Sequence, residues 1–216
     1  MTTEYLREYE FESGEIVKVC CQSSDLGFGG TVWDAGLVMC AFLESQIGRS
    51  LISDCVCLEL GSGTGIVTIA ASVLGTKQCY ASDLGLCVPF IRQNVGLNPN
   101  STAKCLEVDW ENESVLGPLA DWILCADCVY DSHNVQALTQ CISRLRPAKG
   151  VIVCNERREG NPAEAEKMFI SEMLKNGYIG KGVHRDVIRP DWRCDDIHVV
   201  IFEQPHGLTR DSSKGA

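Results

Sequence analysis

The chain has 216 residues, of which 45% are hydrophobic and 22% charged, as is typical of one globular domain; this composition excludes the disordered and collagen-like classes. Its 29 acidic and 19 basic side chains give a net charge of −10, so we expect neither nucleic acid nor a membrane surface as a partner. The charge favours a partner protein with a basic surface.

The cysteines and the apolar segments bear on the compartment. The 13 cysteines are odd in number, and we interpret those inside apolar runs as buried, reduced thiols: Cys55, Cys57, Cys79, Cys125 and Cys154. The acidic N-terminal segment lacks the apolar core of a signal peptide, and no stretch approaches the roughly 20 apolar residues of a membrane-spanning helix. We therefore expect the reducing cytoplasm, with the nucleus also open.

The predicted elements alternate between strands and helices. A strand at 15–21 and a glycine-rich loop at 23–30 precede a helix that begins near Asp34, its expected N-cap, and runs to Gly48. The elements expected after residue 55 are strand 56–60, helix 66–74, strand 78–82, helix 86–95, strand 104–108, strand 122–126, a helix capped by Ser132, strand 151–155, a further helix, and strands near 178–187 and 196–203. The helix after strand 151–155 is expected to have Asn161, Pro162 and Glu164 at its N-cap, N1 and N3 positions and Gly177 at its end.

This alternation predicts an α/β fold. Strands that are apolar throughout are typical of a parallel sheet covered by helices on both faces, and the last two strands are expected to close it as an antiparallel pair. We expect a single domain over residues 1–203, in which residues 1–50 form an N-terminal extension, and a disordered polar tail at 204–216.

The strongest local signal is the segment LELGSGTG, in which a strand runs through Glu59 into Gly61, Ser62 and Gly63 and then into a helix. A glycine turn at the carboxyl end of a strand is typical of a ligand site. A dinucleotide fingerprint requires Gly or Ala where this chain has Ile66, and Glu59 would repel a pyrophosphate. S-adenosylmethionine carries a sulfonium and an ammonium but no phosphate, so the turn favours it over NAD; a tight turn without a ligand is the alternative.

Further polar and aromatic residues follow the other strands. Asp83 stands 22 positions beyond the first glycine of the turn, where it can accept hydrogen bonds from both ribose hydroxyls, although it could also cap a helix. Asp109 and Trp110 follow the next strand, where the ring could meet adenine or pack in the core. Asp127 and Tyr130 follow strand 122–126 at the topological switch point, where Asp127 either caps the next turn or faces a ligand.

Other chemistries find no support in the sequence. Cys125 and Cys128 form a CxxC pair, but no second pair at zinc spacing accompanies them and the four histidines are scattered, so we expect no metal site. The HExxH, GxSxG and GxxxxGK[ST] motifs are absent from the sequence, which excludes the common zincin, α/β-hydrolase and P-loop classes.

Seven blocks in a fixed order resemble the seven-strand protein-lysine methyltransferases that carry an Asp-x-x-Tyr motif. The resemblance covers about residues 15–203 and implies a Rossmann-like class I methyltransferase with a seven-stranded sheet, S-adenosyl-L-methionine as cofactor and a lysine of a folded protein as acceptor. The blocks are TVWDAG (31–36), LELGSGTG (58–65), YASDL (80–84), VDW (108–110), CADCVYD (125–131), NERREGNP (155–162) and DDIHVVIF (195–202).

The last two blocks are most similar to the branch of the family that methylates valosin-containing protein, an AAA ATPase. The resemblance therefore implies that protein, or another ATPase or chaperone, as the partner. Separately, we expect a monomer. It also implies site residues: Asp127 and Tyr130 at the catalytic mouth, and Trp33, Gly61, Ser62, Gly63, Asp83, Trp110 and Ala126 around the cofactor.

The expected role of Asp127 follows from the chemistry of lysine. Free lysine has a pKa of about 10.4, so the acceptor amine must lose a proton before transfer. A desolvated channel beside the sulfonium lowers that pKa, and Asp127 can hold the ammonium and then orient the amine, with Tyr130 as a wall or hydrogen-bond partner. The alternatives are a methyltransferase for a small molecule or for another protein, a methyltransferase for nucleic acid, which the net charge of −10 disfavours, and an interaction protein that binds S-adenosylmethionine without turnover.

Overall fold

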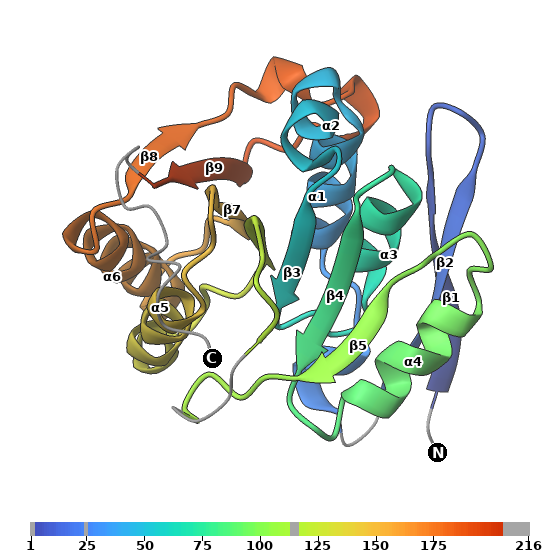
Figure 1. Ribbon diagram of the computed structural model, residues 1–216, viewed down its shortest axis with the longest axis horizontal. Coiled ribbons are helices and arrows are strands. Elements are labelled where there is room, and N and C mark those ends of the chain that lie inside the picture. The colour runs from blue at the N-terminus through green and yellow to red at the C-terminus, as the bar shows by residue number, and fades with distance from the viewer. Residues whose placement is uncertain (1–2, 24–25, 113–116, 205–216) are drawn as a thin grey trace, which may run out of the picture.

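The computed structural model describes residues 3–23, 26–112 and 117–204, and within them it contains a seven-stranded sheet and a separate two-stranded hairpin (Figure 1). The sheet has the order β5-β4-β3-β6-β7-β9-β8, in which β9 pairs antiparallel with β7 and β8 while the remaining pairs are parallel. The strands are β1 (Thr3–Glu10), β2 (Ile16–Ser23), β3 (Val56–Leu60), β4 (Gln78–Asp83), β5 (Lys104–Glu107), β6 (Trp122–Ala126), β7 (Gly150–Glu156), β8 (Ile179–Gly182) and β9 (Ile197–Glu203).

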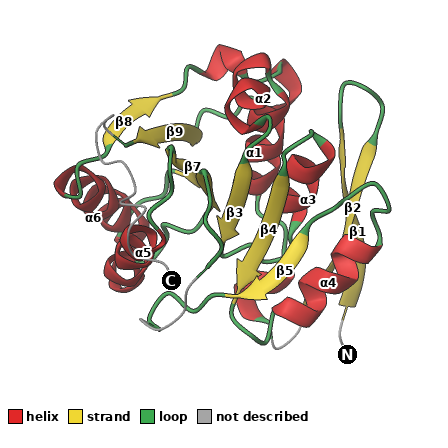
Figure 2. Ribbon diagram, in the orientation of Figure 1, coloured by secondary structure: helices red, strands yellow, loops and turns green. Residues whose placement is uncertain are grey.

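Helices cover both faces of this sheet (Figure 2). The chain forms α1 (Asp34–Glu44), α2 (Gln46–Ile52), α3 (Ile66–Val73), α4 (Val88–Gly96), α5 (Ser132–Leu145) and α6 (Asn161–Lys175), with short 3-10 turns at Gly27–Gly30, Arg185–Val187 and Pro190–Trp192. Helices α1 and α3 and the hairpin pack in one apolar cluster, and α5 and α6 in a second cluster on the opposite face. The predicted α/β fold, with its antiparallel C-terminal strand, is confirmed.

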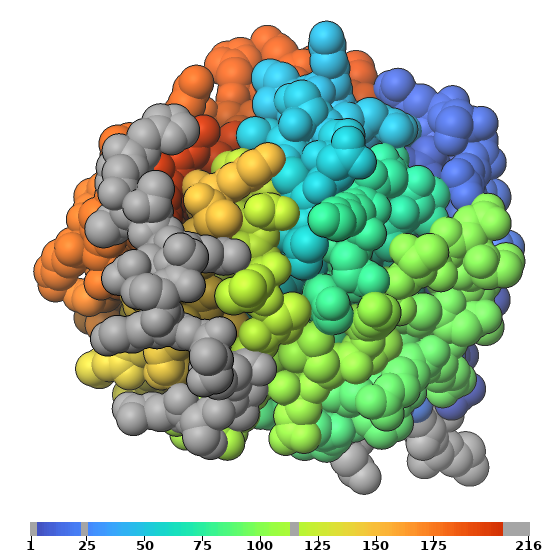
Figure 3. All heavy atoms as spheres, viewed as in Figure 1, coloured from blue at the N-terminus to red at the C-terminus, as the bar shows by residue number. Residues whose placement is uncertain are grey.

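The N-terminal strand β1 was not expected from the sequence, because all but one of its described side chains are exposed and it pairs with β2 alone. Helix α4 secures the hairpin: the side-chain amides of Asn94 and Asn98 each donate to and accept from the backbone of one β2 residue, Cys20 and Lys18, at 2.7–3.1 Å. The two asparagines thereby satisfy backbone groups of β2 as a neighbouring strand would. In the space-filling view the blue hairpin lies at one edge of the molecule (Figure 3), and the C-terminal segment contacts it where Arg189 donates to the Glu10 carbonyl at 2.7 Å.

Three expected helix boundaries were wrong. Trp33, not Asp34, is the N-cap of α1, and the helix expected to reach Gly48 is interrupted at Ser45, whose side chain caps α2 by accepting from the Gly48 amide. Gly160, not Asn161, is the N-cap of α6. A side chain can cap only from a residue whose backbone is still extended, and the sequence pattern alone does not show which residue that is.

The cap of α5 was also assigned to the wrong residue. Asp131, not Ser132, is the N-cap, and its carboxylate accepts from the His133 amide at 3.0 Å. It also accepts from Asn161 at the start of α6, at 3.1 Å. The hydrogen bond from the His133 amide is the main cause that lowers the pKa of Asp131 to about 2.

The remaining sequence-based expectations concern the cysteines, the strand after α6, the C-terminal residues and membrane-spanning helices. The thiols predicted to be buried, Cys55, Cys57, Cys79, Cys125 and Cys154, are buried. The strand expected near 178–187 is shorter, Ile179–Gly182. Residues 205–216, where a disordered tail was expected, lie outside the described residues. Among the described helices, none has both the length and the apolar character needed to cross a membrane.

Candidate active site

Four neighbouring parallel strands, β5, β4, β3 and β6, end at the same edge of the sheet, and the residues that follow them surround a cavity of about 550 Å³. This volume lies within the range of small-molecule sites. All the residues that the sequence analysis selected line this one cavity: Trp33, Glu59, Gly61, Ser62, Gly63, Asp83, Trp110, Ala126, Asp127 and Tyr130. The structure therefore brings the whole predicted set together, while the role of each residue stays a prediction.

The glycine turn after β3 forms the floor of the cavity. Gly61 and Gly63 have φ of 65° and 54°, in the left-handed region where side chains are strained. A Cβ atom at Gly61 would come within 3.0 Å of both the Cys128 thiol and the Trp110 ring, and one at Gly63 within 3.3 Å of the Gly29 carbonyl. Glycine is required at these positions because neighbouring chain segments approach the backbone closely.

Glu59 is 2% exposed and points toward the start of α3. Its carboxylate accepts from the backbone amide of Thr68 at 2.9 Å and from the Thr68 hydroxyl. Burial raises the pKa of Glu59 to about 7, against the hydrogen bonds from Thr68, which lower it. One carboxylate oxygen is thus committed to the protein, and Glu59 adds negative charge to the cavity as pH rises through about 7.

Asp83 and Ser62 join the turn to the end of β4. The Asp83 carboxylate accepts from the Gly63 amide and from the Leu84 amide, both at 2.8 Å. The Ser62 hydroxyl accepts from the Ser82 amide at 2.9 Å. Asp83 does not cap α4, whose N-cap is Cys87, so the helix-cap alternative for this residue was wrong. Its carboxylate is fixed beside the glycine turn, with lone pairs left for hydroxyl donors.

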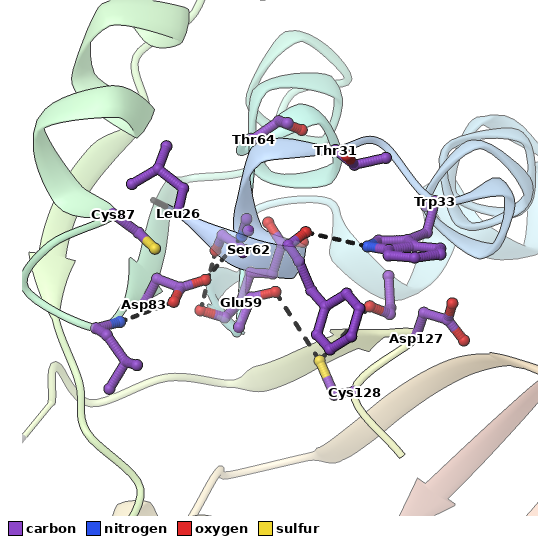
Figure 4. A pocket seen from close by; sticks show the side chains of 18 of the residues that line it. Leu26, Thr31, Trp33, Glu59, Ser62, Thr64, Asp83, Cys87, Asp127 and Cys128 are labelled. Carbon is purple, nitrogen blue, oxygen red and sulfur yellow. Dashed lines mark hydrogen bonds between the residues drawn. The ribbon is translucent and has the colours of Figure 1, made fainter. Parts of the chain in front are cut away.

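The opposite side of the cavity carries aromatic rings. Phe28, in the 3-10 turn after β2, lies 5.8 Å from the ring of Trp33 and 5.7 Å from that of Tyr130, edge-on to both. The Trp33 indole donates to the Phe28 carbonyl at 3.2 Å. Burial raises the pKa of Tyr130, which keeps its hydroxyl protonated. Figure 4 shows Trp33 and Asp127 on one side of the cavity and Asp83 and Cys87 on the other.

Asp127 is held by an ion pair that the sequence analysis did not predict. Both of its oxygens accept from the guanidinium of Arg158, at 3.0 and 2.6 Å, and the side chain of Asp127 is only 3% exposed. Its φ of 55° lies in the left-handed region, which costs a non-glycine residue on the order of 1 kcal/mol or more. Asp131 caps the next helix instead, so the capping alternative for Asp127 was wrong.

The described charged residues that line the cavity are all acidic. Five carboxylates line the cavity, and no Lys, Arg or His is among its described lining residues; the carboxylates are Glu59, Asp83, Asp109, Glu111 and Asp127. A cavity of this sign repels phosphates and attracts cations. It fits S-adenosylmethionine, which has two positive groups and no phosphate, and it fits the ammonium of an acceptor lysine.

Two residues of the site, Phe28 and Arg158, were missed. Phe28 lies in the glycine-rich loop that the sequence analysis left without a role, and an aromatic residue in such a loop was the available signal. Arg158 lies in the block NERREGNP, but its partner across the sheet edge cannot be identified from sequence spacing.

The CxxC pair does not resemble a metal site. Cys128 is hydrogen-bonded to Cys125 and to the Leu60 carbonyl, at 3.1 Å for the latter, and the hydrogen bond with Cys125 together with burial raises the pKa of the Cys128 thiol well above its ordinary value. Metal ligands are thiolates, so the Cys128 thiol is a poor ligand. Among the described residues no group of three or more His, Cys, Asp or Glu side chains could hold a metal ion.

Comparison with known proteins identifies the family. Residues 13–176 match the family described as lysine methyltransferase. The protein N-lysine methyltransferase METTL21A of Danio rerio is 33% identical over 81% of this chain and 77% of its own length. The chain belongs to the lysine methyltransferase family. The METTL21A protein of Xenopus tropicalis is 36% identical over 61% of this chain and 62% of its own length, and the EEF1A lysine methyltransferase 3 of Mus musculus is 29% identical over 85% and 75%.

Solved structures support the fold. The 16S rRNA methyltransferase RsmC of T. Thermophilus superposes with a TM-score of 0.65 at 16% identity, over 94% of this chain and 51% of that one. The magnesium protoporphyrin IX methyltransferase of Synechocystis gives 0.57 at 14% identity, over 80% and 84%. The fold is that of the class I methyltransferases. The predicted enzyme class, a protein-lysine N-methyltransferase that uses S-adenosylmethionine, is confirmed at the level of the family.

Proposed function

We propose that this methyltransferase acts on a lysine of a folded protein, and that its acceptor site is the part of the cavity between Asp127 and the rings of Phe28, Trp33 and Tyr130. The proposal moves Trp33 from the cofactor, where the family resemblance implies it, to the acceptor, because its ring lies 5.8 Å from that of Phe28. The main observation that supports this proposal is that a buried carboxylate and three aromatic rings lie beside a glycine turn in a cavity lined by acidic residues. An aromatic, acidic channel suits the apolar stem and the cationic end of lysine.

The residues divide the work of the reaction between them. When bound, S-adenosylmethionine would supply the methyl group, and the acceptor lysine would first lose one proton to solvent so that its nitrogen carries a free lone pair. The glycine turn and Asp83 hold the donor, and Glu59 adds negative charge beneath it. Asp127 orients the amine, and the three rings exclude water from the path of attack.

For the partner we propose valosin-containing protein, or another ATPase or chaperone. The support for this choice is the resemblance of residues 155–162 and 195–202 to the branch of the family that modifies that ATPase. The net charge of −10 favours a lysine in a basic surface region. A second candidate is elongation factor 1A, since the relative from Mus musculus is named for it.

The test is transfer of labelled methyl groups to purified proteins. Recombinant valosin-containing protein, elongation factor 1A and an ATP-dependent chaperone are each incubated with the enzyme and labelled S-adenosylmethionine, and modified lysines are mapped by mass spectrometry. Labelling of one lysine in valosin-containing protein is the expected result. Labelling of elongation factor 1A alone would reject the first partner and support the second. Binding of the donor without labelling of any of these proteins or of a whole lysate would favour an interaction protein without turnover.

The setting of the enzyme is part of the proposal. We propose that it acts as a monomer in the cytoplasm, with the nucleus as a further location. Eleven of its thirteen cysteines are buried and none is in a disulfide, as suits a protein kept in a reducing compartment. Light scattering at micromolar concentration and imaging of the tagged protein in cells test the two statements separately.

A further inference from the structure

The ion pair between Asp127 and Arg158 joins two strand ends at the acceptor side of the cavity. Asp127 follows β6 and Arg158 follows β7, the neighbouring strand. The guanidinium donates to both Asp127 oxygens and to the carboxylate of Glu156, and its centre lies 5.8 Å from the Trp33 ring. The backbone amide of Glu156 also donates to Asp127, at 3.4 Å. Two parallel bonds from a planar guanidinium fix the plane of the Asp127 carboxylate, which a single contact would leave free to rotate.

Arg158 lies outside the cavity lining, so it differs from the residues that can contact a ligand directly. Asp127 lines the cavity, whereas Arg158 and Glu156 do not. Arg158 therefore binds Asp127 from the outer side and leaves the space in front of the carboxylate to the acceptor. The side chain of Arg158 is 27% exposed and that of Glu156 35%, against 3% for Asp127, so the charged cluster extends from the cavity toward solvent.

The charges of the cluster set the protonation of the acceptor. Two carboxylates and one guanidinium leave one net negative charge, which attracts one ammonium. If the guanidinium were lost, two negative charges would hold the acceptor as its cation, and its proton would be harder to remove. The hydrogen bonds that Arg158 donates to Asp127 and the charge of that carboxylate raise the pKa of Arg158 further, so the guanidinium stays charged at every working pH.

We propose that Arg158 is a positioning residue of methyl transfer, which fixes the Asp127 carboxylate at the acceptor side of the cavity and offsets its charge so that the acceptor amine loses its proton. The inference rests on the proposed function, because it requires an amine acceptor at Asp127. In the step that it assists, the ammonium proton passes to solvent, the nitrogen lone pair forms the bond to the methyl carbon, and the carbon–sulfur bond breaks with its electrons going to sulfur.

The first experiment needs no protein substrate. Sinefungin is an analogue of S-adenosylmethionine in which a carbon bearing an amino group replaces the methylated sulfur, so its ammonium reports the potential where the methyl group is transferred. Calorimetry gives its affinity relative to that of S-adenosylhomocysteine, which lacks this charge. In Arg158→Gln the ratio should rise roughly 3- to 10-fold, since the carboxylates lose their counter-charge. In Glu156→Gln it should fall by a similar factor.

Matched variants separate charge from geometry. Arg157→Gln removes an exposed guanidinium one residue away and should leave the ratio unchanged. Arg158→Lys keeps the charge without the two parallel bonds, so it should retain the wild-type ratio. An unchanged ratio in both Arg158→Gln and Glu156→Gln would overturn the inference. If Arg158→Gln does not fold, as judged by circular dichroism, the opposite-signed effect of Glu156→Gln still decides.

The second experiment follows transfer against pH with the protein that the wild-type enzyme labels. In the plot of kcat against pH, the rising part of the curve should shift to higher pH by about half to one unit in Arg158→Gln, because the acceptor amine loses its proton at higher pH. Arg158→Lys should keep the rising part where it is in the wild type, with a lower plateau. A structural role for Arg158 would lower the plateau without shifting the rising part. A wild-type enzyme that binds neither analogue would refute the proposed donor, whereas binding with an unaltered ratio would refute the role of Arg158 alone.

Discussion

The two sides of the cavity differ in what holds their side chains. The side that we propose binds the donor, called the donor wall, consists of Glu59, Gly61, Gly63 and Asp83. It is fixed by two left-handed glycines, a carboxylate that accepts from two backbone amides, and a buried acid bonded to α3. Each of these contacts is short and lies close to a strand end. The donor wall is therefore preorganised, and a substitution in it should change donor binding or stability.

The side that we propose binds the acceptor, called the acceptor wall, consists of Phe28, Trp33, Asp127 and Tyr130, and it is held mainly by side-chain contacts. Phe28 is 66% exposed and Trp33 39%, and Asp127 depends on a guanidinium that reaches it from the next strand. Few of its contacts involve the backbone of the same segment. A substitution here should change transfer to the acceptor and leave the donor bound. The following predictions test this division, beginning with the largest effect.

Asp127→Asn should separate donor binding from transfer most strongly. The variant keeps the size of the side chain but loses the charge that attracts and orients lysine, so transfer should fall at least 100-fold, on the order of 3 kcal/mol of transition-state stabilisation. Affinity for S-adenosylmethionine by calorimetry should stay within a few fold of the wild-type value. A folded variant with near-wild-type transfer would contradict the role assigned to Asp127.

Glu59→Gln should change the pH dependence of stability. The pKa of Glu59 in the folded protein is raised to about 7 by burial, above its ordinary value, so the folded state binds this proton more tightly. Protonated Glu59 therefore stabilises the folded state. This stabilisation is fully present below the pKa that Glu59 has in the unfolded chain, and it is lost as pH rises through about 7; the total change in the free energy of unfolding is about 3 kcal/mol. The glutamine side chain of the variant cannot ionise, so the variant should lose less free energy of unfolding than the wild type between pH 4.5 and 8.

Urea unfolding at a series of pH values measures that difference. The variant and the wild type should have similar stabilities near pH 4.5 and diverge as pH rises. If the free energies of unfolding of the variant and the wild type changed with pH in parallel, the pKa of Glu59 in the folded protein would not be raised. Donor affinity should weaken in the variant at pH 8, where the wild-type carboxylate is charged.

Asp83→Ala should weaken donor binding without abolishing the fold. The loss of charge-assisted hydrogen bonds to the ribose should cost roughly 1.5 to 3 kcal/mol of binding free energy. Because Asp83 also accepts from the Gly63 amide, the glycine turn should loosen, with a small fall in melting temperature. Calorimetric affinity equal to that of the wild type would refute the ribose contact.

The same division explains what the sequence could predict. The donor wall was predictable because a glycine turn, an acid before it and an acid after the next strand are fixed at short spacing along the chain. The α/β class and the mostly parallel sheet were predictable for the same local reason, because the apolar strands alternate with helices along the chain. Strand β1 was missed because its described side chains, except Tyr9, are exposed and give no apolar run.

The acceptor wall was predictable only in part. Asp127 and Tyr130 follow a strand and share its signal, but Phe28 and Arg158 reach the site from other segments. Their contacts depend on the order of the strands and on side-chain rotamers, which no spacing specifies. Asp131 was read only as part of the CADCVYD block, because the sequence does not show that the backbone stays extended there and turns helical at the next residue.

Phe28→Ala should give the smallest effect and the sharpest test of the acceptor wall. The ring contacts Trp33 and Tyr130 but is mostly exposed, so the free energy of unfolding should change by no more than about 0.5 kcal/mol. KM for the protein acceptor should rise several fold, since the ring no longer shields the lysine stem, while donor affinity should not change. Leu119→Ala, an exposed apolar residue that does not line the cavity, is the matched control and should leave both unchanged. A loss of donor affinity in Phe28→Ala, with KM unaltered, would assign this ring to the donor and erase the division between the two walls.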